Sequence, residues 1–144
     1  MKKFLFRLEP VLKNRSGKED KAILAQSIAL KEYKRQVNYL EKISNDLKDV
    51  AEIEMSSITA QECLTRSLYM DYLTLSMEKQ EKAVELALRQ LETERKLLIQ
   101  ARKDKLVLEK LKDKLYNGYT KKINMWEAKV NDDQCMALAH RRKG

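Results

Sequence analysis

Few residues of this chain could carry covalent or metal chemistry, and their spacing does not favour it. The two cysteines, Cys63 and Cys135, lie far apart in the sequence, and the one histidine, His140, sits in a basic cluster. Zinc sites and disulfide frameworks need several such residues at short, regular spacings. The sequence also has no glycine-rich phosphate loop, no G-x-S-x-G motif and no cysteine with a plausible histidine partner. We therefore expect a protein that is not an enzyme, with no catalytic or metal-binding residues, no cofactor and no small-molecule substrate.

The composition predicts long helices. Of 144 residues, 36% are charged and only 3 are glycine and 1 is proline, so the chain can reverse direction only once or twice. Leu, Lys, Glu, Ala, Gln and Arg dominate, and all six are good helix formers. No apolar run approaches the ~20 residues that cross a bilayer. The apolar patch after the first three residues is also too short for a secretory signal, and we expect a cytoplasmic protein.

A heptad pattern predicts a first helix over about residues 8–55. Two sets of positions alternate at spacings of four and three for about six heptads, which is typical of a coiled coil. Ile23, Leu30 and Val37 widen the apolar stripe on one flank. The first set is Leu8, Arg15, Ala22, Ala29, Gln36, Ile43 and Val50, and the second is Leu12, Glu19, Gln26, Tyr33, Leu40 and Leu47.

The pattern stops at MSSITAQE, Met55–Glu62, where a bend over about residues 55–60 is expected. Thr59 and Glu62 have the S/T-x-x-E form of a capping box. In this motif the hydroxyl accepts a hydrogen bond from the Glu amide while the carboxylate reaches back to the Thr amide. A second helix is therefore predicted from about residue 60.

The second helix is predicted to run to about residue 138, with a possible kink near 117–118. Gln90 and Asp104 would lie on its seam, where polar residues lower stability but fix register or partner choice. The predicted stripe is Tyr69, Tyr72, Ser76, Ala83, Leu86, Gln90, Leu97, Ala101, Asp104, Leu108, Leu111 and Leu115.

Two long helices joined by a short connection pack antiparallel within one chain. The predicted fold is therefore all-α: a long antiparallel two-helix coiled coil, or helical hairpin, with the second helix longer than the first. We expect a single elongated domain over residues 1–144. Such a hairpin buries only a seam and offers little concave surface for a substrate, so it suits a strut, adaptor or shaft.

The charge distribution indicates a basic terminal end. Residues 1–21 carry 7 Lys/Arg and 3 Asp/Glu, residues 96–144 carry 13 and 6, and residues 22–95 carry 10 and 13. A hairpin would bring the two basic regions together, which suggests an acidic partner and weak supplementary attraction to an anionic membrane. Nucleic acid is disfavoured as a partner, because acidic residues are interleaved with the basic ones and no nucleic-acid-binding motif accompanies them.

The stretch FLFRLEPVLKNR, Phe4–Arg15, places aromatic residues at period two before the one proline of the sequence. It resembles the amino terminus of the FliJ family of flagellar export proteins, which often begin with aromatic-x-aromatic/apolar-x-Leu-x-x-Val-Leu-x-x-Arg/Lys. The matching residues are Phe4, Phe6, Leu8, Val11, Leu12 and Arg15.

The other end is similar to the same family. WEAKVNDDQCMALAHRRKG resembles its carboxy-terminal block of a charged helix, an acidic pair and a closing basic cluster, and LEKLKDK, Leu108–Lys114, resembles the segment before that block. Cys135 and Met136 depart from the family, which commonly has another small or apolar residue after the acidic pair. The matching residues of the block are Glu127, Lys129, Asp132, Asp133, Arg141 and Arg142.

The resemblance implies a stalk or adaptor of the flagellar type III export apparatus. Its partners would be the hexameric export ATPase, a membrane export-gate protein and export chaperones, at the cytoplasmic face of the cell membrane. The candidate partner-binding residues are Phe4, Phe6, Leu8, Arg15, Trp126, Asp132, Asp133, Arg141 and Arg142.

Two other functions and one local question stay open at this point. A virulence-associated type III secretion stalk would share the architecture, and a free-standing coiled-coil scaffold could dimerise through the overhang of its second helix. Phe4 and Phe6 could pack on the second helix, near Met125 or Trp126, and clasp the two termini together. Alternatively, the two rings could stay exposed and anchor a partner.

Overall fold

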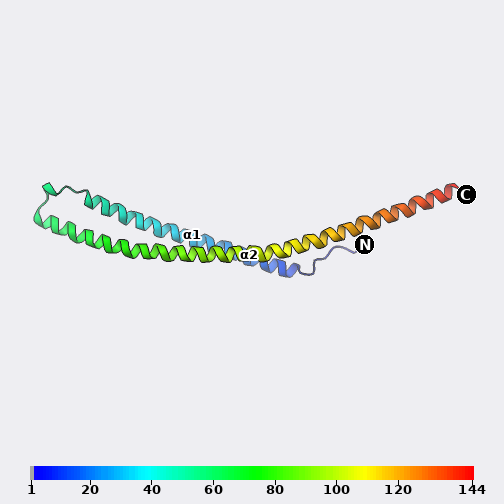
Figure 1. Ribbon diagram of the computed structural model, residues 1–144, viewed down its shortest axis with the longest axis horizontal. Helices are drawn as coiled ribbons and strands as arrows, with labels where there is room; N and C mark the ends of the chain where they lie inside the picture. Colours follow the sequence, from blue (N-terminus) through cyan, green and yellow to red (C-terminus); the bar gives the residue numbers. More distant parts are fainter. Residues whose placement is uncertain (1) are drawn as a thin grey trace. The chain divides into compact units, whose positions relative to one another are not determined.

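The computed structural model describes residues 2–144, and two long helices make up most of them (Figure 1). Helix α1 spans Glu9–Ala51, the short 3-10 helix η1 spans Met55–Ser57, and helix α2 spans Ala60–Arg142. The two long helices pack antiparallel as a hairpin, α2 is the longer, and the described residues form no strand. The predicted fold class is therefore confirmed.

Two compact units divide the hairpin, and each contains a part of both helices. The terminal unit combines the residues up to Glu19 with Ala101–Gly144, and the bend unit is Asp20–Gln100. In the bend unit the cyan part of α1 runs beside the green part of α2 in the opposite direction (Figure 1). Among the described residues, no helix combines the length and apolar character that crossing a bilayer requires.

The start of α1 follows from its proline. Residues 2–6 form an irregular lead, and the Glu9 amide donates to the Phe6 carbonyl at 3.1 Å as the helix begins. Pro10 then lies in the first turn, where a backbone N–H has no acceptor within the helix. The N–H that proline lacks therefore costs the helix no hydrogen bond. The helix therefore begins one residue after the predicted start near residue 8, and Phe4 to Phe6 precede it.

The connection between the helices is closed by two sets of hydrogen bonds. The predicted capping box forms: the Thr59 amide donates to Glu62 Oε2 at 3.1 Å, and the Glu62 amide donates to Thr59 Oγ1 at 3.2 Å. Arg66 on α2 donates from Nε to the Val50 carbonyl at 2.9 Å and from Nη2 to the Ala51 carbonyl at 3.1 Å. These last carbonyls of α1 have no donor within the helix, so the arginine satisfies them, together with the Ile53 amide at 3.4 Å from the Val50 carbonyl.

The predicted heptads of α1 match its packing. Every residue of the two sets is buried or half-buried except Leu8, which is exposed. Of the residues expected to widen the stripe, Leu30 and Val37 are half-buried and Ile23 is exposed. The buried residues of the bend unit are Ala29 on α1 and Leu73, Ala87, Leu91 and Leu98 on α2.

The predicted stripe of α2 is wrong in phase. Through most of the helix the residues that face α1 lie one position after the predicted ones, and a shift of one residue rotates the face by about 100°. Leu86 and Leu97 are exposed, whereas the next residues, Ala87 and Leu98, are buried. The predicted positions Ser76, Ala83, Ala101 and Leu108 are buried or half-buried.

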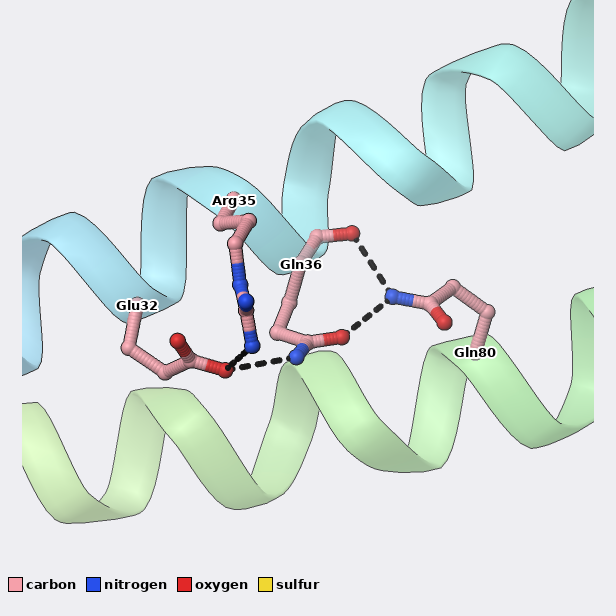
Figure 2. A network of polar contacts seen from close by, with 4 residues as sticks. All are labelled: Glu32, Arg35, Gln36 and Gln80. Carbon is pink, nitrogen blue, oxygen red and sulfur yellow. Dashed lines mark hydrogen bonds and ion pairs between the residues drawn. The ribbon is translucent and has the colours of Figure 1, made fainter.

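The polar seam residues also differ from those expected. Gln90 is exposed and donates to Glu94 on its own helix, and Asp104 is exposed as well. Instead, Gln80 donates from Nε2 to the Gln36 side-chain oxygen at 2.6 Å and to the Gln36 carbonyl at 2.9 Å (Figure 2). This pair joins the two helices, so it takes the register-fixing role that was assigned to Gln90 and Asp104.

Glu32 extends this network, and its ionisation is expected to couple the stability of the bend unit to pH. Gln36 Nε2 donates to Glu32 Oε1 at 2.7 Å, and Arg35 lies 2.9 Å from the same oxygen (Figure 2). The Gln36 hydrogen bond, and secondarily Arg35, lower the pKa of Glu32 from its ordinary value of 4.5. The ionised carboxylate therefore stabilises the fold at neutral pH, and this stabilisation disappears as the pH falls through the lowered pKa.

Replacing Glu32 by glutamine is expected to lower the melting temperature at pH 7 and to make no difference once the pH is below the pKa of the carboxyl. Thermal unfolding of the protein and Glu32→Gln between pH 7 and pH 3, followed by circular dichroism, measures this. Glu41→Gln, at an exposed carboxyl of the same helix, is the control. A difference between protein and Glu32→Gln that is constant across the series would contradict the assigned role.

Gly17 lies inside α1, where glycine has no structural advantage. A Cβ added there meets no atom within 4 Å outside the local helix, and no described glycine has a positive φ. Gly17→Ala is therefore expected to raise the free energy of unfolding by about 0.5–1 kcal/mol, because alanine loses less backbone entropy on folding. Urea unfolding measures the change, and Gly118→Ala in α2, at an equally open site, is expected to act in the same direction. A lowered midpoint for either variant would contradict the prediction.

Candidate functional site

The amino-terminal lead packs on α2 in the terminal unit. Phe6 is buried, with 9% of its surface exposed, and forms an apolar cluster with Leu12 of α1 and Leu108 of α2. Phe4 packs against this cluster from outside. Leu5, which points to the other side of the extended lead, is 86% exposed. The period-two alternation of the motif thus separates a face on α2 from a solvent face.

Aromatic contacts hold Phe4 to α2. Its ring centroid lies 5.3 Å from that of Tyr116, edge to face, and 5.5 Å from that of Tyr119. The Tyr119 hydroxyl donates to the Lys2 carbonyl at 2.7 Å. Met125 or Trp126 was the expected neighbour, whereas the ring partners are two tyrosines that lie earlier on α2. One turn of helix separates these tyrosines, so both reach the same ring.

Charged residues also join the two helices next to this aromatic cluster. Glu9 and Lys112 form an ion pair at 2.8 Å, and the Lys112 ammonium also lies 5.9 Å from the Phe6 ring centroid. Glu19 lies 3.2 Å from Lys105, and its hydrogen bond to this residue is the main cause that raises the pKa of Lys105. Such ion pairs at a half-buried helix surface add little stability individually, so their main effect is to favour one alignment of the helices.

Arg15, a candidate partner-binding residue, is occupied within the protein. Its Nη1 donates to the backbone carbonyl of Asp104 at 2.7 Å, and its side chain is half-buried. Leu8, another candidate, is exposed at the start of α1. Of these two, only Leu8 has much of its surface open to a partner.

The last turns of α2 continue beyond the tyrosines as an exposed helix. In the terminal unit its residues from 121 onward are exposed except for half-buried Ile123 and Val130. Trp126 has 52% of its surface exposed. The remaining candidates on this segment are all exposed: Asp132, Asp133, Arg141 and Arg142.

The candidate residues therefore form two surfaces. The lead residues Phe4 and Phe6 pack on α2 around Tyr116 and Tyr119, whereas Trp126 and the charged residues after it lie further along α2. A possible kink near 117–118 was the only feature predicted between Tyr116 and Tyr119, whereas α2 is continuous there. Their spacing of three residues, which puts both rings on one helix face, was the signal that could have identified them.

The surface offers little that could enclose a substrate or a metal ion. One hollow is lined by Cys135, Leu138, Ala139 and Arg142, with Lys143, and so by consecutive turns of a single helix end. Among the residues that the structure describes, no group of three or more His, Cys, Asp or Glu side chains could hold a metal ion. The helix end presents charged and aromatic side chains to solvent.

Known proteins resemble this chain over nearly its whole length. The solved structure of CT670 from Chlamydia trachomatis, proposed to be a YscO homolog, has a TM-score of 0.62 and 18% sequence identity, and the match covers 99% of this chain and 100% of that one. At this identity the similarity establishes the fold alone. No curated protein sequence matches. The family model described as "Flagellar FliJ protein" matches residues 3–144. Because this match spans almost every residue, the chain belongs to the FliJ family.

Proposed function

We propose that this protein is a stalk or adaptor of the bacterial flagellar type III export apparatus. It would bind the hexameric export ATPase and link it to the export-gate membrane protein and to export chaperones. It would work in the cytoplasm, peripherally at the cytoplasmic face of the membrane, and its loss would prevent flagellum assembly and with it motility and chemotaxis. The match of the family model over residues 3–144 is the observation that carries this proposal.

The exposed end of α2 is the part that fits a contact with the ATPase. Trp126 supplies an exposed aromatic ring, and Arg141, Arg142 and Lys143 supply a basic cluster. Aromatic and arginine side chains are the ones that most often anchor protein interfaces. An acidic lining of the partner would attract this cluster at long range and speed the encounter.

A stalk of a virulence type III secretion system is the second candidate function. The observation in its favour is the fold similarity to the proposed YscO homolog. Affinity purification of the tagged protein from its host, followed by mass spectrometry, separates the two. Recovery of the flagellar ATPase supports the flagellar function, recovery of a virulence ATPase supports the second candidate, and recovery of neither contradicts both.

Reversing the basic cluster is expected to slow binding of the purified ATPase without affecting folding. In Arg141→Glu/Arg142→Glu/Lys143→Glu the association rate should fall by roughly tenfold at low salt, because steering acts mainly on association. The difference should shrink as salt is added, since exposed charges are screened over ~8 Å at physiological ionic strength. Biolayer interferometry over a salt series measures both.

The matched control reverses three exposed lysines of the bend unit, Lys21, Lys31 and Lys34. This variant has the same net charge as the terminal one, so a general charge effect would slow both equally. Equal slowing, or binding that does not respond to salt, would contradict a contact through the basic cluster.

A further inference from the structure

Four exposed lysines form one line along α2 in the terminal unit. Their spacings of seven, four and seven residues keep them within about 40° of the helix circumference, over about 27 Å of its length. Leu108 and Lys112, which contact α1 and the lead, lie roughly 140–180° away, so the line is on the side of α2 opposite α1. We call these four residues the lysine face: Lys103, Lys110, Lys114 and Lys121.

The carboxylates of this part of α2 lie away from the lysine face. Between residues 103 and 125 they are Asp104, Glu109 and Asp113, each at least about 80° from the line of lysines. Among the described residues, none forms an ion pair with the four lysines. Lys110 and Lys114 are four residues apart, a spacing at which like charges destabilise a helix. Negative charge supplied from outside the chain would relieve this repulsion.

Aliphatic side chains border the lysines. Leu106, Val107 and Met125 lie within about 60° of the line. Their surfaces are 47%, 63% and 73% exposed. Between residues 103 and 125, no aromatic residue and no arginine lies in the same arc. The surface therefore combines ammonium groups with aliphatic side chains alone.

This combination favours one kind of polyanion. Lysine is depleted in protein interfaces, and the residues that anchor them are mostly Trp, Tyr and Arg. A flexible, strongly hydrated ammonium group suits a diffuse negative surface, whereas arginine suits one paired carboxylate. Single-stranded nucleic acids stack their bases on aromatic rings, which this face lacks. Anionic lipid headgroups attract lysines without such requirements, and aliphatic side chains can enter the boundary between headgroups and acyl chains.

We propose that the lysine face binds an anionic membrane surface, with this part of α2 lying parallel to the bilayer. The lysines would lie against lipid phosphates, and Leu106, Val107 and Met125 would enter the headgroup region. This proposal deepens the peripheral membrane location in the proposed function by naming the surface and the lipid class. It needs neither the ATPase nor the gate protein, so a failure to bind lipid would leave the export function to the purification experiment.

Sedimentation of the full chain with vesicles tests the proposal. We expect at least tenfold tighter binding to vesicles of phosphatidylcholine with phosphatidylglycerol than to phosphatidylcholine alone, and weaker binding as salt is added. Lys110→Gln/Lys114→Gln should weaken binding at least tenfold, because each lysine near an anionic membrane contributes about 1 kcal/mol. Val107→Ala/Met125→Ala should weaken it several-fold. The four side chains are exposed, so the helix content of these variants, measured by circular dichroism, should be unchanged.

The matched control is Lys31→Gln/Lys34→Gln, which removes the same charge from two exposed lysines of the bend unit. It should weaken binding less than twofold. Equal weakening by this control, equal binding to the two kinds of vesicle, or unchanged binding of Val107→Ala/Met125→Ala would overturn the proposal. So would tighter binding to a single-stranded oligonucleotide or to polyglutamate that Lys110→Gln/Lys114→Gln abolishes, because the occupant would then be a nucleic acid or an acidic protein.

Discussion

Replacing Leu91 by alanine is expected to lower the free energy of unfolding of the bend unit by about 3 kcal/mol. Leu91 is the most enclosed large side chain in the described part of the hairpin, with 1% of its surface exposed. Truncating such a leucine removes its apolar burial and leaves a cavity, which costs about 2–5 kcal/mol in protein cores. A two-helix seam can partly close over the cavity, so the lower half of this range is expected.

Urea unfolding followed by circular dichroism measures the loss, and hydrogen exchange of amides in Asp20–Gln100 shows whether it is confined to the bend unit. Leu86→Ala is the matched control, because Leu86 lies five residues earlier on the same helix and is 72% exposed. Its replacement should change the free energy of unfolding by less than about 0.5 kcal/mol. Equal losses at the two positions would mean that Leu86 also lies in the seam, as the predicted stripe had it. That result would contradict the exposure of Leu86 in the structure.

The heptads of α1 were predictable for a physical reason. Toward the end of this helix apolar residues stand singly between polar ones, as at Ile43 and Leu47, so only one heptad phase brings them to one face. The capping box at Thr59 and Glu62 was equally predictable, because its two hydrogen bonds form between neighbouring residues and need no tertiary contact. Local rules and a single possible phase were enough to predict the hairpin and its bend.

The phase of α2 could not be predicted from periodicity, because adjacent apolar residues satisfy two phases equally. Each of the pairs Leu86–Ala87 and Leu97–Leu98 offers one apolar residue to either phase. At the first pair the larger side chain, that of Leu86, favoured the phase that the structure shows to be wrong. The structure places the small Ala87 in the seam, where the two helix backbones can approach. Which phase is buried depends on α1 as a partner, and the pattern of one helix contains no such information.

The candidate site was predicted in part for the same reason. The alternation of Phe4, Leu5 and Phe6 was sufficient to predict which rings share a side, since it depends only on extended backbone geometry. The rings' neighbours depend on how far the lead extends along α2, a tertiary quantity. Tyr116 and Tyr119 were therefore missed, and Trp126 was expected in their place.

The aromatic contacts of the lead favour one of the two roles left open for the opening motif. Because Phe6 is buried and Phe4 packs on two tyrosines, we expect the pair to clasp the lead to α2. Phe4→Ala/Phe6→Ala should cost the terminal unit about 3 kcal/mol, near the lower limit for truncating a buried phenylalanine, since Phe4 is only half-buried. Urea unfolding, with hydrogen exchange of the amides in Glu9–Glu19 as the local measure, tests this.

A matched variant separates stability from binding. Leu5→Ala, at the exposed residue between the two rings, should leave the unfolding transition of the terminal unit unchanged. If the rings are a clasp, Phe4→Ala/Phe6→Ala loses stability but its folded fraction still binds the export ATPase at the normal rate. If they anchor the partner, the double variant melts normally and loses binding, which would contradict the burial of Phe6. Lost binding by Leu5→Ala alone would assign the partner contact to the solvent face of the lead, where the alternation leaves one large apolar side chain uncovered.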